Sequence, residues 1–340
     1  MSNPVQKNKE YKKFIVDSRL QYFKPHATRI EKTFAEEISS SLGRNLKSIP
    51  PKFFYDKKGS DLFEKICSVL EYYPTRTEIS ILQKLKTELS LFLDGDFRLV
   101  ELGSGSSTKT RLLLDFLTAS QKTTEYFPID ISEILAESSE ELLNDYKNLS
   151  ITGIIDTYEG GLEFLKTYDD KKNLIIFLGS SFGNFSPVDG YKFLEKIFST
   201  MKPGDLFLIG LDLVKDTSIL ESAYNDSKGI TAKFNLNVLS RINDELDADF
   251  NLENFSHYAV YNEKDQRIEM YLKSLTEQSV IISKSDLELK LQKDELIHTE
   301  YSHKYRLSQI HDLLDDVGFE LKHTWLDDKK YFSLTLVSKN

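Results

Sequence analysis

The sequence predicts an α/β fold built on a doubly wound parallel sheet, and two observations support this prediction. Between Arg98 and Asp212, short apolar runs alternate with amphipathic segments of helix length, a pattern typical of successive β-α-β units with right-handed crossovers. The first apolar run leads into the glycine turn 103–105, and a helix is expected directly after it. A strand, a glycine turn and a helix N-terminus form the corner at which such folds bind nucleotides.

The segment before this alternation is expected to be helical up to about residue 50. Ile30, Phe34, Ile38 and Leu42 recur every four residues, so they share one face of a helix. Two prolines at 50–51 end the segment.

The alternating part predicts five parallel strands. The unbroken apolar run at 174–178 is typical of a central strand that is buried on both faces. Ser186 followed by Pro187 begins a helix in the preferred way, with a capping residue before a proline. The five expected strands lie at 98–102, 126–130, 151–155, 174–178 and 206–209.

After Asp212 the alternation stops. Helical signals continue through Leu239, and alternating strands are expected at 268–272 and 287–291. We interpret this part as an insertion that forms a second, α+β domain with the N-terminal segment. The tail returns to the first domain through a helix that ends at Gly318 and a hairpin of two strands. The predicted domains are 1–77 with 214–304, and 78–213 with 305–340.

Composition limits the class of function. The chain has 340 residues, of which 40% are hydrophobic and 29% charged, as expected of a globular protein with room for two domains. Its net charge of −10 disfavours a nucleic-acid partner. There is no apolar run of about 18 residues and no apolar signal core in the polar N-terminus, so we expect a cytoplasmic protein without a membrane partner, and a monomer.

We expect no metal site. Cys67 is the only cysteine, so the chain has no intrachain disulfide and no thiolate cluster. His298 and His303 stand at a spacing that fits no zinc pattern.

The residues at the glycine corner favour one kind of cofactor. Asp130 ends the second strand, at about the separation at which an acid meets ribose hydroxyls. The dinucleotide fingerprint requires a third glycine where Thr108 stands, which disfavours NAD. S-adenosylmethionine carries no pyrophosphate and is favoured instead. Lys109, just inside the helix, is either a ligand for the carboxylate of that cofactor or a solvated helix lysine.

A series of motifs then runs in a known order through most of the chain from about residue 50 to 310. They are the segments 51–56, 59–63, 71–76, 101–105, 177–180, 183–184, 212–216, 234–239, 268–270 and 299–302. On these motifs the chain resembles the histidine-specific Nα-methyltransferases of ergothioneine biosynthesis, which form trimethylhistidine (hercynine). The resemblance implies a class I methyltransferase fold (Rossmann-like), S-adenosylmethionine as methyl donor with S-adenosylhomocysteine as product, and L-histidine as substrate.

The resemblance also implies roles for single residues. Asn184 and Tyr224 match the positions that hold the substrate carboxylate, and Glu300 and Ser302 match those that hold the imidazole. Tyr55 matches a position assigned to both catalysis and cofactor binding. The positions that surround the substrate are Tyr72, Gly179, Ser181, Asn184, Tyr224, Met270, Glu300 and Ser302. The positions that bind the cofactor are Tyr55, Gly103, Lys109, Asp130, Gly161 and Leu162.

One position departs from the family pattern. The family has an Asp-Phe pair near the end of the third strand, on the adenine side of the cofactor. Here Gly161 and Leu162 stand at the aligned positions, with Glu159 two positions earlier. Either Glu159 substitutes in a shifted loop, or this contact is absent.

The residue types agree with a histidine substrate. A carboxylate such as Glu300 accepts an imidazole N–H, and the Ser302 hydroxyl serves the other ring nitrogen. An aromatic ring such as Tyr72 favours a methylated, cationic amine. Two alternatives remain: the same fold methylating another amino acid such as tryptophan, and a catalytically silent amino-acid-binding protein. Glu300 suits imidazole better than indole, and Met270 fills space that a larger ring needs.

Overall fold

The computed structural model describes residues 11–26, 33–105, 107–131 and 135–339. The predicted helix residue Ile30 lies outside this part. The chain forms two compact units, which are described separately. Unit 1 comprises residues 1–29, 77–213 and 305–340, and unit 2 comprises residues 30–76 and 214–304.

Unit 1 is built on a nine-stranded sheet in the order β1-β2-β5-β4-β3-β6-β7-β14-β13. The five central strands β5, β4, β3, β6 and β7 are parallel, and β14 runs antiparallel to β7. The parallel strands lie at the predicted positions, and the predicted C-terminal hairpin is present as β13 and β14. The strands are β1 (Tyr11–Ile15), β2 (Leu20–Pro25), β3 (Arg98–Leu102), β4 (Thr124–Asp130), β5 (Leu149–Ile155), β6 (Asn173–Phe177), β7 (Leu206–Asp212), β13 (Glu320–Leu326) and β14 (Phe332–Ser338).

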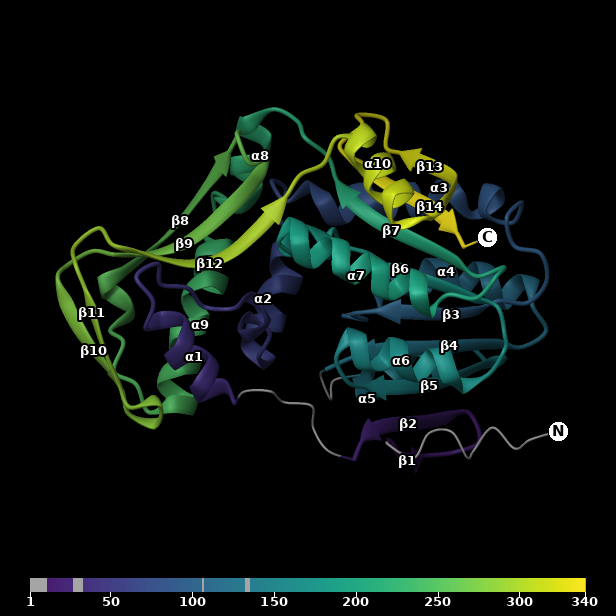
Figure 1. Cartoon of the computed structure of the whole chain (residues 1–340), viewed down its shortest axis with the longest axis horizontal. Helices are drawn as coiled ribbons and strands as arrows, with labels where there is room; N and C mark the ends of the chain where they lie inside the picture. Colours follow the sequence, from purple (N-terminus) through teal and green to yellow (C-terminus); the bar gives the residue numbers. More distant parts are fainter. Residues whose placement is uncertain (1–10, 27–32, 106, 132–134, 340) are drawn as a thin grey trace. The chain divides into compact units, whose positions relative to one another are not determined.

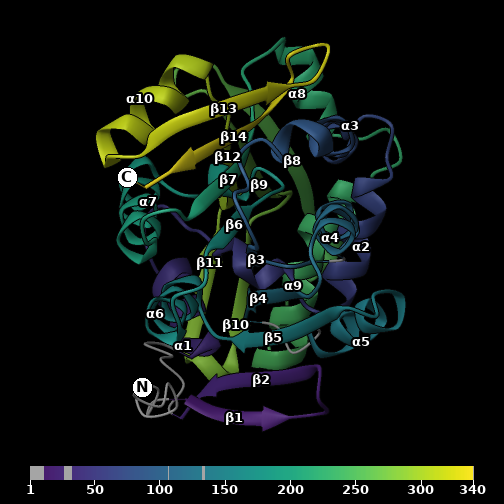
Figure 2. The same cartoon turned by 90° about the vertical axis from the view of Figure 1, so that its right-hand side faces the viewer.

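Helices cover both faces of this sheet, as a doubly wound fold requires. Leucines and isoleucines of α3, α4 and α5 pack on one face, and side chains of α6, α7 and α10 pack on the other (Figure 2). The predicted Ser186 cap and Gly318 C-cap are confirmed at α7 and α10. The helices are α3 (Tyr73–Leu89), α4 (Thr108–Ser120), α5 (Leu135–Asp145), α6 (Tyr158–Tyr168), α7 (Pro187–Thr200) and α10 (Leu307–Val317).

The N-terminal prediction was wrong in part. Among the described residues before position 50, only α1 (Phe34–Leu42) is helical, and β1 and β2 precede it as an antiparallel hairpin (Figure 1). β2 pairs parallel to β5, where Tyr22 packs directly over Gly153; a Cβ at Gly153 would lie 2.5 Å from that ring. Because this pairing buries Tyr22 against unit 1, the hairpin belongs to unit 1 and not to the second domain in which we had predicted residues 1–77.

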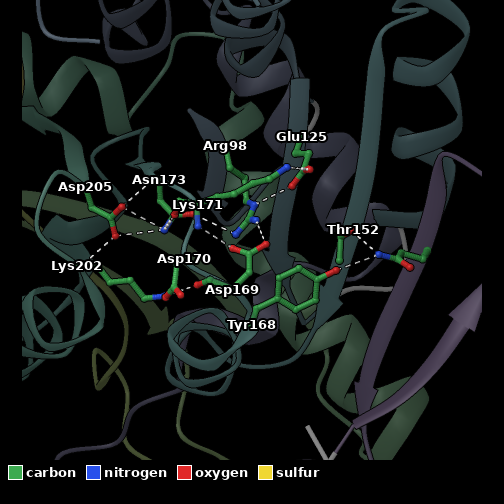
Figure 3. Close-up of polar contacts among 11 residues, drawn as sticks. Arg98, Glu125, Thr152, Tyr168, Asp169, Asp170, Lys171, Asn173, Lys202 and Asp205 are labelled. Atoms are coloured by element: carbon green, nitrogen blue, oxygen red, sulfur yellow. Dashed lines mark hydrogen bonds and ion pairs between the residues drawn. The ribbon is translucent and has the colours of Figure 1, made fainter. Parts of the chain in front are cut away.

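Ion pairs close the amino-terminal edge of the sheet. The Arg98 guanidinium is buried and lies 3.1 Å from Glu125 and 2.5 Å from Asp169 (Figure 3). Nearby, the Asp205 carboxylate accepts the Asn173 backbone N–H at 2.7 Å. These charged and polar groups are paired with one another, so we assign this amino-terminal end of the strands a structural role. Ligands of open parallel sheets bind at the opposite edge, beyond the carboxyl ends of the strands.

Unit 2 combines helices with antiparallel strands. The predicted strands at 268–272 and 287–291 are present in β9 and β11, and three further strands were not predicted. β9 is the middle strand of the sheet β12-β9-β8, and β10 pairs with β11. Apolar side chains of α1, α2 and α9 form the core with these strands. The strands are β8 (Phe255–Asn262), β9 (Arg267–Ser274), β10 (Gln278–Ile282), β11 (Leu287–Leu291) and β12 (Leu296–His303), and the helices include α2 (Lys57–Cys67), α8 (Thr217–Tyr224), α9 (Ile230–Leu246) and the short η2 (Pro51–Phe54), η4 (Leu252–Asn254) and η5 (Ser283–Ser285).

None of the helices in the described part of the chain is long and apolar enough to cross a membrane.

Candidate active site

The predicted strand, glycine turn and helix are present in unit 1. β3 runs into Gly103 (φ +77°) and Gly105 (φ +47°), and α4 begins at Thr108. At Gly103 a Cβ atom would lie 2.7 Å from the Tyr158 hydroxyl oxygen, whereas at Gly105 it would meet no atom within 4 Å. The absence of a Cβ at Gly103 therefore allows the Tyr158 hydroxyl to lie close to the backbone. Both glycines also adopt a backbone conformation that residues with a side chain avoid.

Asp130 lies at the carboxyl end of β4, beside this turn. Its Oδ2 accepts the backbone N–H of Ser104 at 3.2 Å. The contact fixes the carboxylate next to the glycine corner. Because a carboxylate is an acceptor only, Asp130 is suited to accept hydrogen bonds from the vicinal hydroxyls of a ribose.

A second carboxylate supports the corner from within the sheet. Glu101 is buried and accepts hydrogen bonds from the hydroxyls of Thr110, at 2.8 and 2.9 Å, and Tyr126. Burial raises the pKa of Glu101 to about 7, although these two hydroxyls act in the opposite direction. Glu101 thus joins β3 to α4 and β4. The sequence analysis quoted it within a motif but gave it no role.

Lys109 has a partner that neither sequence interpretation included. Its Nζ lies 2.9 Å from Oε2 of Glu78, a fully buried residue of α3. The same carboxylate accepts the backbone N–H of Gly179 at 2.9 and 3.0 Å. Glu78 therefore connects α4 to the loop after β6. An acid two residues after the 71–76 motif was the only sequence signal for it.

The loop after β6 carries three of the predicted substrate residues. Gly179 (φ +80°) and Ser180 (φ 58°) adopt the left-handed conformation, and Ser181 and Asn184 follow in η3 (Ser181–Asn184). The Ser180 hydroxyl accepts the backbone N–H of Asp212 at 3.0 Å, which ties the loop to the end of β7. Ser181 is exposed and Asn184 is half-buried, so the Asn184 amide is presented from the carboxyl edge of the sheet.

The structure differs from the prediction for Gly161 and Leu162. Both lie in α6, one turn beyond its start. A Cβ at Gly161 would lie 2.3 Å from the Ile129 side chain, and Leu162 is fully buried in the core. They serve helix–strand packing, and the Leu162 side chain does not reach the edge. Tyr158, at the start of α6, lies beside Gly103 instead, and Glu159 is exposed.

In unit 2, Tyr224, Ser302 and Lys304 form a buried polar cluster. Tyr224 is the last residue of α8, and its hydroxyl donates to Oγ of Ser302 in β12 at 2.8 Å. Lys304 is only 2% exposed. Its ammonium donates to the hydroxyl oxygens of Tyr224 and Ser302, at 3.1 and 2.8 Å. Lys304 was not predicted. It directly follows β12 and continues the alternation Glu300, Ser302, Lys304, which places it next to two predicted residues.

Glu300 lies on the same strand, opposite Met270 of β9. The β12–β9 pairing is irregular between His298 and Glu300, and such bulges re-aim a side chain. Glu300 is 8% exposed, and burial raises its pKa to about 7 against the effect of the nearby Lys304 charge. No hydrogen bond from the described residues reaches its carboxylate. Glu300 is therefore a buried acceptor available to a ligand.

Aromatic rings of unit 2 lie near these groups. The ring of Tyr72 lies 6.1 Å from that of Tyr224 and 6.4 Å from that of Phe63. Tyr55 contacts Phe63 and Phe234 and is 44% exposed. Burial, and next the Tyr224 hydroxyl, hold the pKa of Tyr72 well above its usual range. Tyr72 therefore remains a neutral ring.

The two histidines of β12 are not part of this cluster. The rings of His298 and His303 lie 3.8 and 6.2 Å from that of Tyr301, which alternates along the strand with Glu300 and Ser302. Within the described ranges, no three His, Cys, Asp or Glu residues are grouped to hold a metal ion.

The fold and the site together define a class I methyltransferase. The parallel sheet ends in the antiparallel strands β14 and β13, the glycine turn follows the central strand β3, and an acid stands at the end of β4. Comparison with known families narrows the class. The model of the S-adenosylmethionine-dependent, histidine-specific methyltransferases matches residues 34–339, and the chain belongs to this family.

Individual proteins are similar to this chain over most of its length. The chain is 40% identical over 301 residues to a histidine N-alpha-methyltransferase from Mycolicibacterium smegmatis, covering 88% of this chain and 93% of that protein. It is 31% identical to ergothioneine biosynthesis protein 1 from Neurospora crassa, over 86% of this chain and 33% of that longer protein. An L-tryptophan methyltransferase from Psilocybe serbica is 27% identical, over 86% and 89% of the two chains.

Proposed function

We propose that this enzyme transfers methyl groups from S-adenosylmethionine to the α-amino group of L-histidine until trimethylhistidine (hercynine) is formed, the first step of ergothioneine biosynthesis. The proposal includes a monomeric, cytoplasmic enzyme. Two observations support the proposal: the family membership of the chain, and the chemistry of the Glu300 region.

The observation that carries the substrate assignment is the carboxylate of Glu300. A hydrogen bond to a charged group contributes about 1.5–3 kcal/mol. A ligand that brings an N–H group to this carboxylate gains that contribution. Imidazole supplies such an N–H and, on its other ring nitrogen, an acceptor that the nearby Ser302 hydroxyl can reach as a donor. An indole offers the N–H alone.

The residues of unit 1 fit the cofactor. When bound, S-adenosylmethionine supplies a sulfonium methyl group to an amine. Asp130 would accept hydrogen bonds from the ribose hydroxyls of the cofactor. Gly103 has no Cβ, so the cofactor could approach the protein backbone there. Tyr158 places its hydroxyl next to that corner, whereas the Leu162 side chain is buried in the core. Lys109 would hold its carboxylate while paired with Glu78, and Tyr55 keeps its proposed role in cofactor binding and catalysis.

The transfer itself places modest demands on the protein. The acceptor nitrogen would have to be neutral at each transfer, so it would lose a proton between successive transfers. Positioning and a neutral amine matter more than a strong base. We assign Asn184 and Tyr224 to the substrate carboxylate. Tyr72, a neutral aromatic ring, would stabilise the amine as it gains positive charge.

The proposal is tested by calorimetry and mass spectrometry. Histidine is expected to bind in the presence of S-adenosylhomocysteine, and with S-adenosylmethionine it should gain mass in three steps of one methyl. Tryptophan, titrated in the same way, should give neither heat nor product. Cofactor binding without any histidine binding would favour another amino acid, and loss of cofactor binding as well would favour a silent binding protein.

Asp130→Ala is expected to weaken S-adenosylhomocysteine binding by about tenfold or more, because hydrogen bonds to a charged group contribute about 1.5–3 kcal/mol. Isothermal titration with S-adenosylhomocysteine alone measures this. The melting temperature of Asp130→Ala without ligand should stay close to that of the original protein, since Asp130 is only half-buried. Unchanged cofactor affinity would remove Asp130 from the site.

A further inference from the structure

The buried ammonium of Lys304 has no role in the function proposed so far. It donates to two hydroxyl oxygens, of Tyr224 at 3.1 Å and of Ser302 at 2.8 Å, and it is 2% exposed. A lysine ammonium carries three donors and no acceptor. Both hydroxyl oxygens therefore act as acceptors toward Lys304, and each must direct its own proton elsewhere.

The direction of these protons follows from counting. Ser302 Oγ accepts from Lys304 and also from the Tyr224 hydroxyl at 2.8 Å. An hydroxyl oxygen has two lone pairs, so both are occupied and Ser302 can only donate to a further group. The Tyr224 proton rests on Ser302 in this structure. A carboxylate is a stronger acceptor than an hydroxyl, so this proton can turn to a ligand carboxylate while Lys304 keeps its contact with Tyr224. Ser302 then still accepts from Lys304, which keeps its oxygen toward the ammonium and its proton directed away from it.

We propose that Lys304 is a positioning residue that determines specificity, because it makes the Tyr224 and Ser302 hydroxyls hydrogen-bond donors toward the amino-acid ligand. This inference rests on the proposed function, which places the ligand at Glu300 and Ser302. Glu300 accepts a hydrogen bond and Ser302 donates one, so together they favour a ring that has one N–H and one acceptor nitrogen. Neutral imidazole has both, whereas an indole leaves the Ser302 proton without a partner.

Two ring analogues separate the contributions of Glu300 and Ser302. β-(Pyridyl)alanine carries a ring acceptor and no N–H, and β-(pyrrolyl)alanine carries an N–H and no acceptor. Calorimetry in the presence of S-adenosylhomocysteine gives the Kd of each analogue. The ratio of the two Kd values shows whether the Ser302 hydroxyl acts as a donor or as an acceptor toward the ring. Global changes in stability affect both analogues alike, so the ratio is insensitive to a purely structural effect.

Lys304→Met keeps an unbranched side chain that is one heavy atom shorter, and removes the donor. The Ser302 hydroxyl is then able to rotate and to accept from a ring N–H. We expect the preference for the pyridyl over the pyrrolyl ring to fall about tenfold, the usual effect of one hydrogen bond. The KM for histidine should rise by a similar factor, with kcat and the KM for S-adenosylmethionine little changed. Lys273→Met is the matched control, since Lys273 pairs with Asp294 at the partly exposed surface of the same unit.

Ser302→Ala provides the second variant, which does not depend on the folding of Lys304→Met. It should weaken binding of the pyridyl ring and leave the pyrrolyl ring unaffected. In the double variant, Lys304→Met should add nothing to this change in preference, because Lys304 acts on the ring through Ser302. An unchanged ratio in Lys304→Met, or an additive double variant, would overturn the inference while the histidine activity of the original protein still stood. Absence of any histidine binding by the original protein would instead overturn the proposed function, and the inference with it.

Discussion

Glu300→Gln is expected to raise the Kd of histidine by about 10- to 100-fold and to leave S-adenosylhomocysteine binding unchanged. The buried carboxylate has no donor among the described residues, so its acceptor strength is directed at the ligand. Hydrogen bonds to a charged acceptor contribute about 1.5–3 kcal/mol, which corresponds to this range. The amide keeps the size of the side chain, so packing against Met270 is maintained.

Isothermal titration with histidine in the presence of S-adenosylhomocysteine measures this effect. Glu288→Gln, at an exposed position of β11 in the same unit, is the matched control and should bind histidine normally. If Glu300→Gln binds histidine as tightly as the original protein does, Glu300 does not contact the ring and the substrate assignment loses its main support.

The pH dependence of binding should follow Glu300 as well. Its pKa is about 7 in the absence of ligand, so below that pH the carboxyl carries a proton and accepts an N–H poorly. Histidine affinity is therefore expected to rise from about pH 6 to about pH 8, and the ring nitrogen of free histidine, with a pKa near 6.5, loses its proton over the same range. Calorimetric titrations at several pH values test this. The Glu300→Gln variant should retain only the part of the pH dependence that belongs to the ligand.

The stability of the ligand-free protein should change with pH in the opposite direction. Burial raises the pKa values of Glu101 and Glu300 from 4.5 to about 7. The folded state thus binds these protons more tightly than the unfolded chain, so their contribution is full below about pH 4.5 and is lost as the pH rises through 7. Denaturant unfolding across this range measures the trend, which should be weaker in Glu300→Gln. An equal slope in that variant would show that Glu300 is not the group that titrates.

Glu78→Ala is expected to lower the free energy of unfolding by about 3 kcal/mol, since removing one partner of a buried ion pair destabilises a protein by about 3–5 kcal/mol and Lys109 retains some access to water. The substitution also leaves the Gly179 N–H without its acceptor. Glu78→Gln keeps an acceptor for Gly179 and should have a smaller effect. Urea unfolding measures both variants.

Glu78→Ala should also weaken cofactor binding, because Glu78 connects two predicted binding segments of unit 1. Its loss removes the ion pair of Lys109 in α4 and the hydrogen bonds that hold the Gly179 loop. We therefore expect weaker S-adenosylhomocysteine binding at temperatures where the variant is still folded. Glu141→Ala, at an exposed position of α5, is the control and should change stability by no more than about 0.5 kcal/mol. Full stability in Glu78→Ala would contradict the role given to this ion pair.

The predicted parts of the fold are those that local pattern determines. The apolar run at 174–178 became the buried strand β6, and Ser186 and Gly318 became caps, because strand burial and capping depend on residues a few positions apart. The N-terminal segment shows the limit. Its four-residue repeat correctly predicted α1, but no local pattern predicted β2. That strand pairs with β5, about 130 residues away, and its Tyr22 packs on Gly153.

The candidate site divides in the same way. Gly103 and Asp130 were predicted because a positive φ and an acid at a strand end are local signals. Leu162 was assigned to the cofactor by alignment, and the helix α6 buries it. Glu78, 31 residues from Lys109, was not predicted, because no pattern within one segment indicates which distant carboxylate a lysine will meet.

The sequence by itself determined the doubly wound sheet, the glycine corner with its acid, and the kinds of residue that we propose to face an imidazole. Only the tertiary structure decided which of these groups are already paired. It paired Lys109 with Glu78, left Glu300 without a donor in the described part of the chain, and set the direction of the Ser302 proton through Lys304 and Tyr224. The reason is that protonation state and hydrogen-bond polarity depend on burial and on partners distant in sequence: Tyr224 lies 78 residues from Ser302, and the fold alone brings them together.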